Sequence, residues 1–199
     1  MRAGAPGKAV WMVLQGFGWR DIDEGFRKAP DPDKGRRPTP DETRFMAYDA
    51  LVHGAQAILY WGTHAIEKDS EMWADLLRVA REIRALEPAF VGARPRKPPV
   101  AVAHESSASA DPEQGPRLIL RRSGEDWVLI AVLEQSQGCA FTVRGLPRAM
   151  EGRALLRLYT DETHTVRDGR FQDGMRGYGV HVYATSRRFE AQGLKAGAR

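Results

Sequence analysis

The sequence contains very little cysteine. Cys139 is the only one in 199 residues, and a single thiol can form neither an internal disulfide nor a zinc site built from cysteines. It precedes the strand-like residues Phe141 and Val143, so we expect a packed thiol rather than a nucleophile. Histidine is also scarce, and none of the five is in His-x-x-x-His spacing. These patterns predict no metal site and no cofactor.

Targeting segments and long apolar runs are missing as well. Residues Met1–Lys8 have no apolar stretch of the kind found in signal peptides, and no apolar run has the length of a membrane span. Nothing in the sequence therefore indicates a membrane partner. The cytoplasm is the default location for this chain, while the location of a longer parent, secreted or periplasmic, stays open.

The charge shows no strong bias toward either sign. The net charge is +4, and 28% of the residues are charged. The basic groups are spread out apart from Arg94–Lys97, Arg187–Arg188 and the C-terminal end, and such runs are typical of solvated surface. No nucleic-acid-binding motif is present. There is no P-loop, dinucleotide fingerprint or Gly-x-Ser-x-Gly motif either. The 42% hydrophobic content is typical of a globular protein.

Two kinds of pattern divide the chain, and they predict an α/β part followed by an all-β part. Residues 1–90 combine short apolar runs with helical periodicity, and residues 91–99, rich in proline and arginine, indicate a linker. In residues 100–186, short apolar runs are separated by turn signals such as Asp168–Gly169, which favours a small antiparallel β-sandwich. We expect residues 187–199 to be a frayed basic tail.

The clearest local signal lies around Thr39. Thr39 is a good N-cap, Pro40 suits the first helical position and Glu42 completes a capping box. This helix is expected to end at Gly54, before a strand over Ala55–Trp61. A second helix, predicted to begin near Asp69 or Ser70, should end at Pro88.

An earlier strand is predicted over Ala9–Leu14. Both predicted strands are short continuous apolar runs, as expected for strands buried on both faces of a parallel sheet. A long polar loop, Arg20–Pro38, connects the first strand to the helix that begins after Thr39. Loops of this length are usually functional or mobile.

Four segments resemble parts of bacterial glycoside hydrolases: Val10–Gln15, Pro38–Tyr48, His53–Gly62 and Tyr178–Tyr183. The chain is similar to the C-terminal part of a glycoside hydrolase-like protein, with the last two β/α units of a (β/α)8 TIM barrel and a C-terminal β-sandwich. On this mapping Ala9–Leu14 is strand seven and Ala55–Trp61 is strand eight. The resemblance implies a truncated fragment in which Met1 is an internal methionine. It also implies self-association through the unpaired barrel strands.

The resemblance places several residues at a carbohydrate site. Trp61 matches a tryptophan that many retaining glycosidases use to cover the apolar face of a sugar, and Tyr60 precedes it. Trp19 is positioned to line the cleft, and His64 follows in the next loop. The alternatives are an aromatic plug for Trp61, loop packing for Trp19 and exposure without function for His64.

Gln15 departs from the pattern of this family. It falls where retaining barrel glycosidases carry their glutamate nucleophile, and an uncharged amide cannot attack the anomeric carbon. Gln15 can still bind a sugar hydroxyl, or it is a satisfied polar group in the barrel mouth. Glycoside hydrolysis generally needs two carboxyl groups. The loop carboxylates lack apolar neighbours and are expected to be solvated: Asp21, Asp23, Glu24, Asp31 and Asp33.

The sequence therefore identifies no catalytic residue. It favours a fragment of a protein acting on oligo- or polysaccharide, catalytically incompetent by itself. One alternative is a non-catalytic carbohydrate-binding or structural β-domain protein, which a row of exposed aromatics would support. The other alternative is an inert gene fragment.

Overall fold

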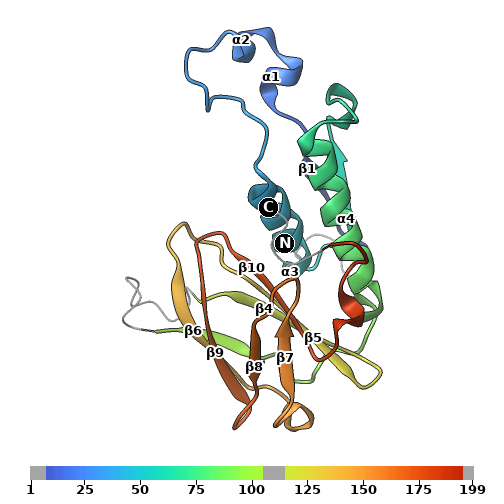
Figure 1. Ribbon diagram of the computed structural model, residues 1–199, viewed down its shortest axis with the longest axis vertical. Helices are drawn as coiled ribbons and strands as arrows, with labels where there is room; N and C mark the ends of the chain where they lie inside the picture. Colours follow the sequence, from blue (N-terminus) through green and yellow to red (C-terminus); the bar gives the residue numbers. More distant parts are fainter. Residues whose placement is uncertain (1–7, 105–114, 195–199) are drawn as a thin grey trace. The chain divides into compact units, whose positions relative to one another are not determined.

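The computed structural model describes residues 8–104 and 115–194 (Figure 1). The chain forms two compact units, one ending at Ala80 and the other beginning at Arg81. We expected the division at residues 91–99, and the linker there stays a prediction. Helices and antiparallel sheets are both present, and the described residues contain no closed barrel.

The first unit is built around one pair of parallel strands. Strand β1 (Trp11–Gln15) pairs with β2 (Ala57–Trp61), so that Trp11 lies opposite Ala57 and Gln15 lies opposite Trp61. The connection runs through three helices, α1 (Trp19–Ile22), α2 (Glu24–Arg27) and α3 (Pro40–Val52). A short 3-10 helix, η1 (Thr63–Ala65), follows β2 and leads to α4 (Glu71–Phe90).

The predicted capping box at the start of α3 is confirmed. Thr39 Oγ1 accepts a hydrogen bond from Glu42 N at 3.2 Å, and Glu42 Oε2 accepts one from Thr39 N at 2.8 Å. Both terminal nitrogens of Arg36 also donate to the Glu42 carboxylate, each at 2.6 Å. The helix is capped at its other end by His53, and Gly54 follows with a φ of 94°. Local sequence alone specifies these ends, because caps act over three or four residues.

Glu42 gives α3 a small pH-dependent stability. The hydrogen bond from Arg36 is the main reason that the pKa of Glu42 is lowered to about 2, from about 4.3 in an unfolded chain. The stabilisation is therefore complete above about pH 4.3 and is lost as the pH falls toward 2. Because the side chain is 45% exposed, we expect Glu42→Gln to cost about 0.5–1 kcal/mol at pH 7. Urea unfolding at pH 7 and pH 2.5 checks this, and a cost that is equal at both pH values contradicts it.

One face of the β1–β2 pair is open, although the two apolar runs taken alone are typical of strands buried on both faces. Trp11 is 70% exposed, Val13 56%, Leu59 53% and Trp61 51%. Strand residues alternate between faces, and these four side chains share one face, which we call the exposed sheet face. Among the described residues β1 and β2 pair only with each other. The apolar runs predicted the two strands correctly. Whether a strand is buried depends on the elements that pack against it, and the sequence of the strand does not show these.

The segment predicted as one long polar loop contains α1 and α2. Asp23 caps α2 by accepting hydrogen bonds from Gly25 N at 2.8 Å and Phe26 N at 3.1 Å. The Arg20 guanidinium donates to the carbonyl oxygens of Lys34 at 2.9 Å and Ala29 at 3.2 Å. The charged residues of this segment thus fold it by capping and by bridging its two halves.

Helix α4 begins close to the predicted start but does not end at Pro88. It continues to Phe90, so the predicted end is wrong. Pro88 lacks an N–H donor, but it lies in the last turn, and that turn is closed by Val91 N donating to Glu87 O at 3.2 Å. No helix among the described residues has the length and apolar character needed to cross a membrane.

The second unit consists of two antiparallel sheets. A five-stranded sheet has the order β4 (Arg117–Ser123), β5 (Asp126–Val132), β10 (Val180–Ala184), β7 (Ala154–Arg157) and β8 (Thr163–Thr165). A three-stranded sheet has the order β3 (Val100–Ala103), β6 (Cys139–Arg144) and β9 (Arg170–Met175). Two further 3-10 turns are η3 (Arg148–Met150) and η4 (Arg187–Phe189).

The two sheets contribute to one hydrophobic core. Leu129 and Tyr183 from the five-stranded sheet join Phe141 and Phe171 from the three-stranded sheet in a single buried cluster. Cys139 belongs to this cluster, and burial raises the pKa of its thiol. The prediction of a packed thiol is therefore confirmed.

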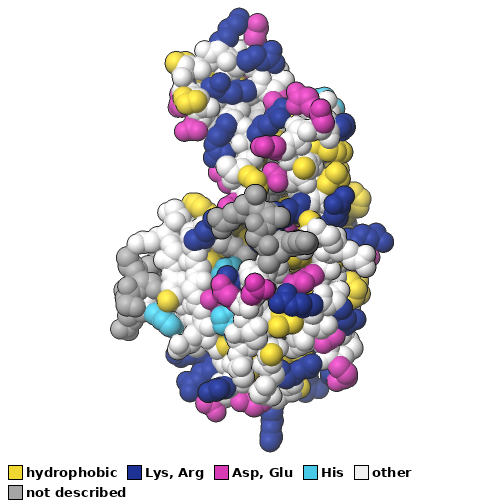
Figure 2. Space-filling view, in the orientation of Figure 1, with side chains coloured by type: hydrophobic (Ala, Val, Ile, Leu, Met, Phe, Trp, Pro, Cys, Tyr) yellow, Lys and Arg dark blue, Asp and Glu magenta, His cyan; other side chains and the backbone are white. Residues whose placement is uncertain are grey.

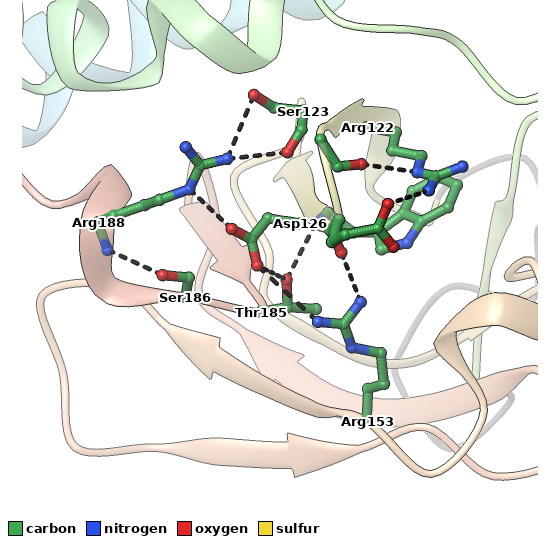
Figure 3. A network of polar contacts seen from close by, with 10 residues as sticks. Arg122, Ser123, Asp126, Arg153, Thr185, Ser186 and Arg188 are labelled. Carbon is green, nitrogen blue, oxygen red and sulfur yellow. Dashed lines mark hydrogen bonds and ion pairs between the residues drawn. The ribbon is translucent and has the colours of Figure 1, made fainter.

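The C-terminal segment is held by a network around Asp126 (Figure 3). Asp126 accepts hydrogen bonds from Arg188 Nε at 2.7 Å and Thr185 Oγ1 at 2.9 Å, and Arg188 also donates to Ser123 O at 2.8 Å. Phe189 is only 1% exposed. We expected a frayed tail from residue 187, but residues 187–194 pack within this unit, and residues 195–199 lie outside the described residues.

Candidate functional site at the ends of the parallel strands

The C-terminal ends of β1 and β2 lie side by side. Gln15 is opposite Trp61, and Gly16 N donates a hydrogen bond to Trp61 O at 2.9 Å. Parallel pairing brings both carboxyl ends to one edge of the sheet, which is where α/β folds bind ligands. The predicted site residues Gln15 and Trp61 are thus brought together.

Phe17 is the centre of an aromatic cluster at this edge. It is 2% exposed, and its ring meets Trp61 edge-on at a centroid distance of 5.0 Å and Trp19 at 5.1 Å. Trp19 also stacks on Phe26 at 5.8 Å. Edge-to-face pairs contribute about 0.5–1.5 kcal/mol each beyond the area they bury. Phe17 therefore positions both tryptophans, while each keeps a large part of its ring in solvent.

Gln15 presents an amide next to Trp61. Its Nε2 donates a hydrogen bond to Phe17 O at 2.8 Å, which fixes the orientation of the amide. Its Oε1 has no hydrogen-bond partner among the described residues. An amide held in this way can accept a hydroxyl hydrogen but carries no charge for nucleophilic attack.

Tyr60 lies on the opposite face of β2 from Trp61, because successive strand residues alternate. It packs against the buried cluster of Phe17, Ile66, Met72 and Leu76. Its hydroxyl is buried without a hydrogen-bond partner among the described residues, and burial raises its pKa to about 12. The structure thus separates Tyr60 from the exposed sheet face, whereas we expected it at the site.

His64 and Trp19 are both exposed. His64 lies on η1, which begins after Gly62, a residue with a φ of 80°. Trp19 begins α1 and is 43% exposed. Trp19 belongs to the aromatic cluster around Phe17, and His64 does not. The loop after β1 therefore contributes an aromatic ring to this edge.

An ion-pair network, which the sequence did not reveal, fixes the loop beside the cluster. Asp21 accepts hydrogen bonds from Gly18 N at 2.7 Å and Arg37 Nε at 3.0 Å, and Arg37 Nη2 pairs with Glu67 at 2.7 Å. These two carboxylates, Asp21 first, raise the pKa of Arg37 further above its ordinary value. The spacing of Gly18 and Asp21 is a local capping signal, but Glu67 is 30 residues from Arg37 and has no such signal.

The other loop carboxylates also have local structural roles. Asp23 caps α2, and Glu24 forms an ion pair with Lys28 at 3.1 Å. Asp31 accepts a hydrogen bond from Asp33 N at 2.9 Å, and the Asp33 carboxylate lies 3.8 Å from the Arg36 guanidinium. Side chains in such caps and exposed pairs lack the burial that makes a carboxyl a general acid. The geometry therefore supports binding at this edge more directly than acid–base catalysis.

The fold is similar to parts of solved α-amylases. An α-amylase from Geobacillus thermoleovorans, solved with acarbose, matches 88% of this chain with a TM-score of 0.55 at 13% identity. A maltogenic α-amylase from Thermotoga neapolitana matches 90% with a TM-score of 0.52 at 10% identity, and the protein AmyP, solved with maltose, matches 88% with 0.51 at 12%.

The matches cover this chain far more completely than they cover the solved proteins. The chain spans 38% of the Geobacillus enzyme, 42% of the Thermotoga enzyme and 40% of AmyP. No protein-family model matches the sequence, and no curated protein sequence matches it. At these identities the likeness concerns the fold alone.

Proposed function

We propose that this chain is part of a glycoside hydrolase-like protein acting on carbohydrate. In this proposal β1, β2, α3 and α4 are the last two β/α units of a TIM barrel, and the two antiparallel sheets that follow α4 are its C-terminal β-sandwich. The parallel pairing of β1 and β2, with α3 between them in sequence, supports the barrel assignment. The fold likeness to α-amylases over most of the chain supports the whole arrangement.

The observation that carries the carbohydrate assignment is the exposed ring of Trp61 beside the amide of Gln15. A pyranose has an apolar C–H face that an aromatic ring can cover, while an amide oxygen accepts a hydroxyl hydrogen. Trp61 is 51% exposed even though Phe17 supports one edge of its ring. We propose that Trp61 stacks on the sugar, that Gln15 binds a hydroxyl, and that Trp19 and His64 lie beside the bound chain.

We propose further that this chain by itself does not hydrolyse glycosides. Gln15 is uncharged, and the five loop carboxylates form caps and ion pairs. The reaction generally needs two carboxyl groups across the glycosidic bond. Its catalytic carboxylates would come from elsewhere in a longer protein. The open edges of β1 and β2 and the exposed sheet face also support self-association of the isolated chain at high concentration.

The test compares two exposed tryptophans on the same sheet face. Trp61→Ala should weaken maltotriose binding at least tenfold, which corresponds to about 1.4 kcal/mol, because the stacking ring is lost. Trp11→Ala is the matched control, since Trp11 is 70% exposed but lies at the opposite end of β1. Isothermal titration calorimetry of dilute protein measures both, and a reducing-sugar assay on the same samples should detect no hydrolysis.

Two results would count against this proposal. Equal losses in the two variants would mean that the exposed sheet face binds sugar without a defined site, or not at all. Hydrolysis by the purified chain that disappears when one of its own carboxylates is replaced would contradict the proposed inactivity.

The alternative, a β-domain that binds carbohydrate through a row of exposed aromatics, receives no support from the second unit. Trp127 is the tryptophan of that unit, and it is 7% exposed within the core. Tyr178 is the exposed large aromatic side chain there. One tyrosine does not form a row.

A further inference from the structure

A polar cluster lies between the two sheets of the second unit. It joins Asp173 on β9 to His164 on β8, His181 and Tyr183 on β10, and Arg157 on β7. Glu162, just before β8, pairs with Arg157. In Figure 2, histidine, acidic and basic side chains lie next to one another on the visible face of this unit. None of these groups belongs to the carbohydrate site proposed above.

Asp173 is the centre of the cluster and is held in one orientation. Its side chain is 9% exposed. Oδ1 accepts a hydrogen bond from Gly174 N at 2.7 Å, and Oδ2 accepts one from the Tyr183 hydroxyl at 2.6 Å. His181 Nδ1 lies 3.1 Å from the same Oδ2. A carboxylate oriented by outer hydrogen bonds in this way resembles the supported ligands of metal centres.

His164 has a buried nitrogen whose contact with Asp173 is poorly placed for a hydrogen bond. Its Nε2 has no hydrogen-bond partner among the described residues, although Asp173 Oδ2 is 3.4 Å away. Zinc bonds nitrogen and oxygen at about 2.0–2.2 Å, so tetrahedral geometry separates two such ligand atoms by roughly 3.4 Å. The spacing that is poor for a hydrogen bond is therefore suited to an ion between the two atoms.

Glu162 supplies a third ligand atom. Its carboxylate, the Asp173 carboxylate and His164 all offer atoms within 4.8 Å of one another. Glu162 is exposed, so a small rotation can bring it closer. The cation now beside both carboxylates is Arg157, which contacts Glu162 and lies 3.7 Å from Asp173 Oδ2.

We propose that His164, Asp173 and Glu162 form a binding site for a divalent transition-metal ion of the zinc type, which links β8 to β9 and so joins the two sheets. A water molecule completes four-coordination, and Tyr183 and His181 orient the carboxylate. Imidazole favours zinc over calcium or magnesium, which prefer all-oxygen sites. No metal motif is visible in the sequence, because Asp173 lies on a different strand from His164 and the ligands have no helical spacing.

The test is calorimetric titration of the chelator-treated full chain with ZnCl₂, with CaCl₂ as the comparison ion. We expect one zinc ion per chain, a melting temperature raised by zinc, and at least tenfold weaker binding in His164→Gln. His104→Gln is the matched control, because His104 bonds Thr142 Oγ1 at 2.8 Å outside the cluster. Arg157→Gln should bind zinc several-fold more tightly, since the competing cation is removed.

Three results would overturn the metal site. The first is that the chain does not bind zinc, and the second is that His164→Gln binds zinc as tightly as the wild-type chain. The third is that His104→Gln weakens zinc binding as much as His164→Gln does. If circular dichroism shows that His164→Gln fails to fold, Glu162→Gln serves instead, because that side chain is half-exposed and its loss should spare the core. Unchanged zinc affinity in Glu162→Gln would then overturn the assignment.

Discussion

Gly62→Ala is expected to destabilise the first unit by about 3–6 kcal/mol. Gly62 has a φ of +80°, where a side chain costs about 1–3 kcal/mol of strain. An added Cβ would also lie 2.3 Å from Cδ1 of Phe17, a ring that is 2% exposed. Displacing a buried phenylalanine ring forfeits much of the 3–5 kcal/mol that its full removal costs, so about 2–3 kcal/mol is added.

Urea unfolding followed by tryptophan fluorescence measures this loss, because Trp19 and Trp61 both contact Phe17. Gly124→Ala is the control for strain alone: its φ is +61° and nothing lies within 4 Å of the added Cβ. It should cost about 1 kcal/mol. If Gly62→Ala costs no more than this control, Phe17 does not hold the strand end in place.

Asp173→Ala is expected to cost the second unit about 3–5 kcal/mol, the range for removing one partner from a buried charge network. Burial opposes the charge on Asp173, yet hydrogen bonds from the surrounding side chains hold its pKa well below the usual range. The variant leaves the Tyr183 hydroxyl without its 2.6 Å acceptor. It also leaves Arg157 and two imidazoles without their central carboxylate.

Thermal and urea unfolding of metal-free protein measure this second loss. Glu125→Ala is the matched control, because that carboxylate is 90% exposed and pairs with Arg122 at 2.9 Å. Exposed pairs contribute at most about 1 kcal/mol. A loss in Asp173→Ala as small as that in the control would show that the inter-sheet cluster does not stabilise this unit.

Sequence predicted well those features that depend on near neighbours. The Thr39–Glu42 capping box and the packed thiol of Cys139 follow from a few adjacent residues. The burial of β1 and β2 did not follow, because an apolar strand such as Trp11–Gln15 is buried only where other elements cover it. Pro88 was predicted to stop a helix that in fact continues for two more residues, because a backbone hydrogen bond from Val91 N to Glu87 O still closes the last turn.

The candidate site could be predicted only in part, again because the sequence shows near neighbours along a strand but not tertiary contacts. Alternation along β2 separates Tyr60 from Trp61, so only one of the two neighbouring aromatics could lie at the open edge with Gln15. The Asp173 cluster could not be predicted, because its members come from four strands in two sheets. His181 and Tyr183 share a face by alternation, but their partner on β9 is set by tertiary packing.

The most direct test of the carbohydrate site is a nuclear magnetic resonance titration of the ¹⁵N-labelled chain with maltotriose. The chain has five tryptophans, and Trp61→Phe assigns the indole signal of Trp61. We expect maltotriose to shift this signal and the side-chain amide signals of Gln15, while the indole signals of Trp11 and Trp127 stay in place. Shifts confined to Trp127 and the second unit, or no shifts at millimolar sugar, would contradict it.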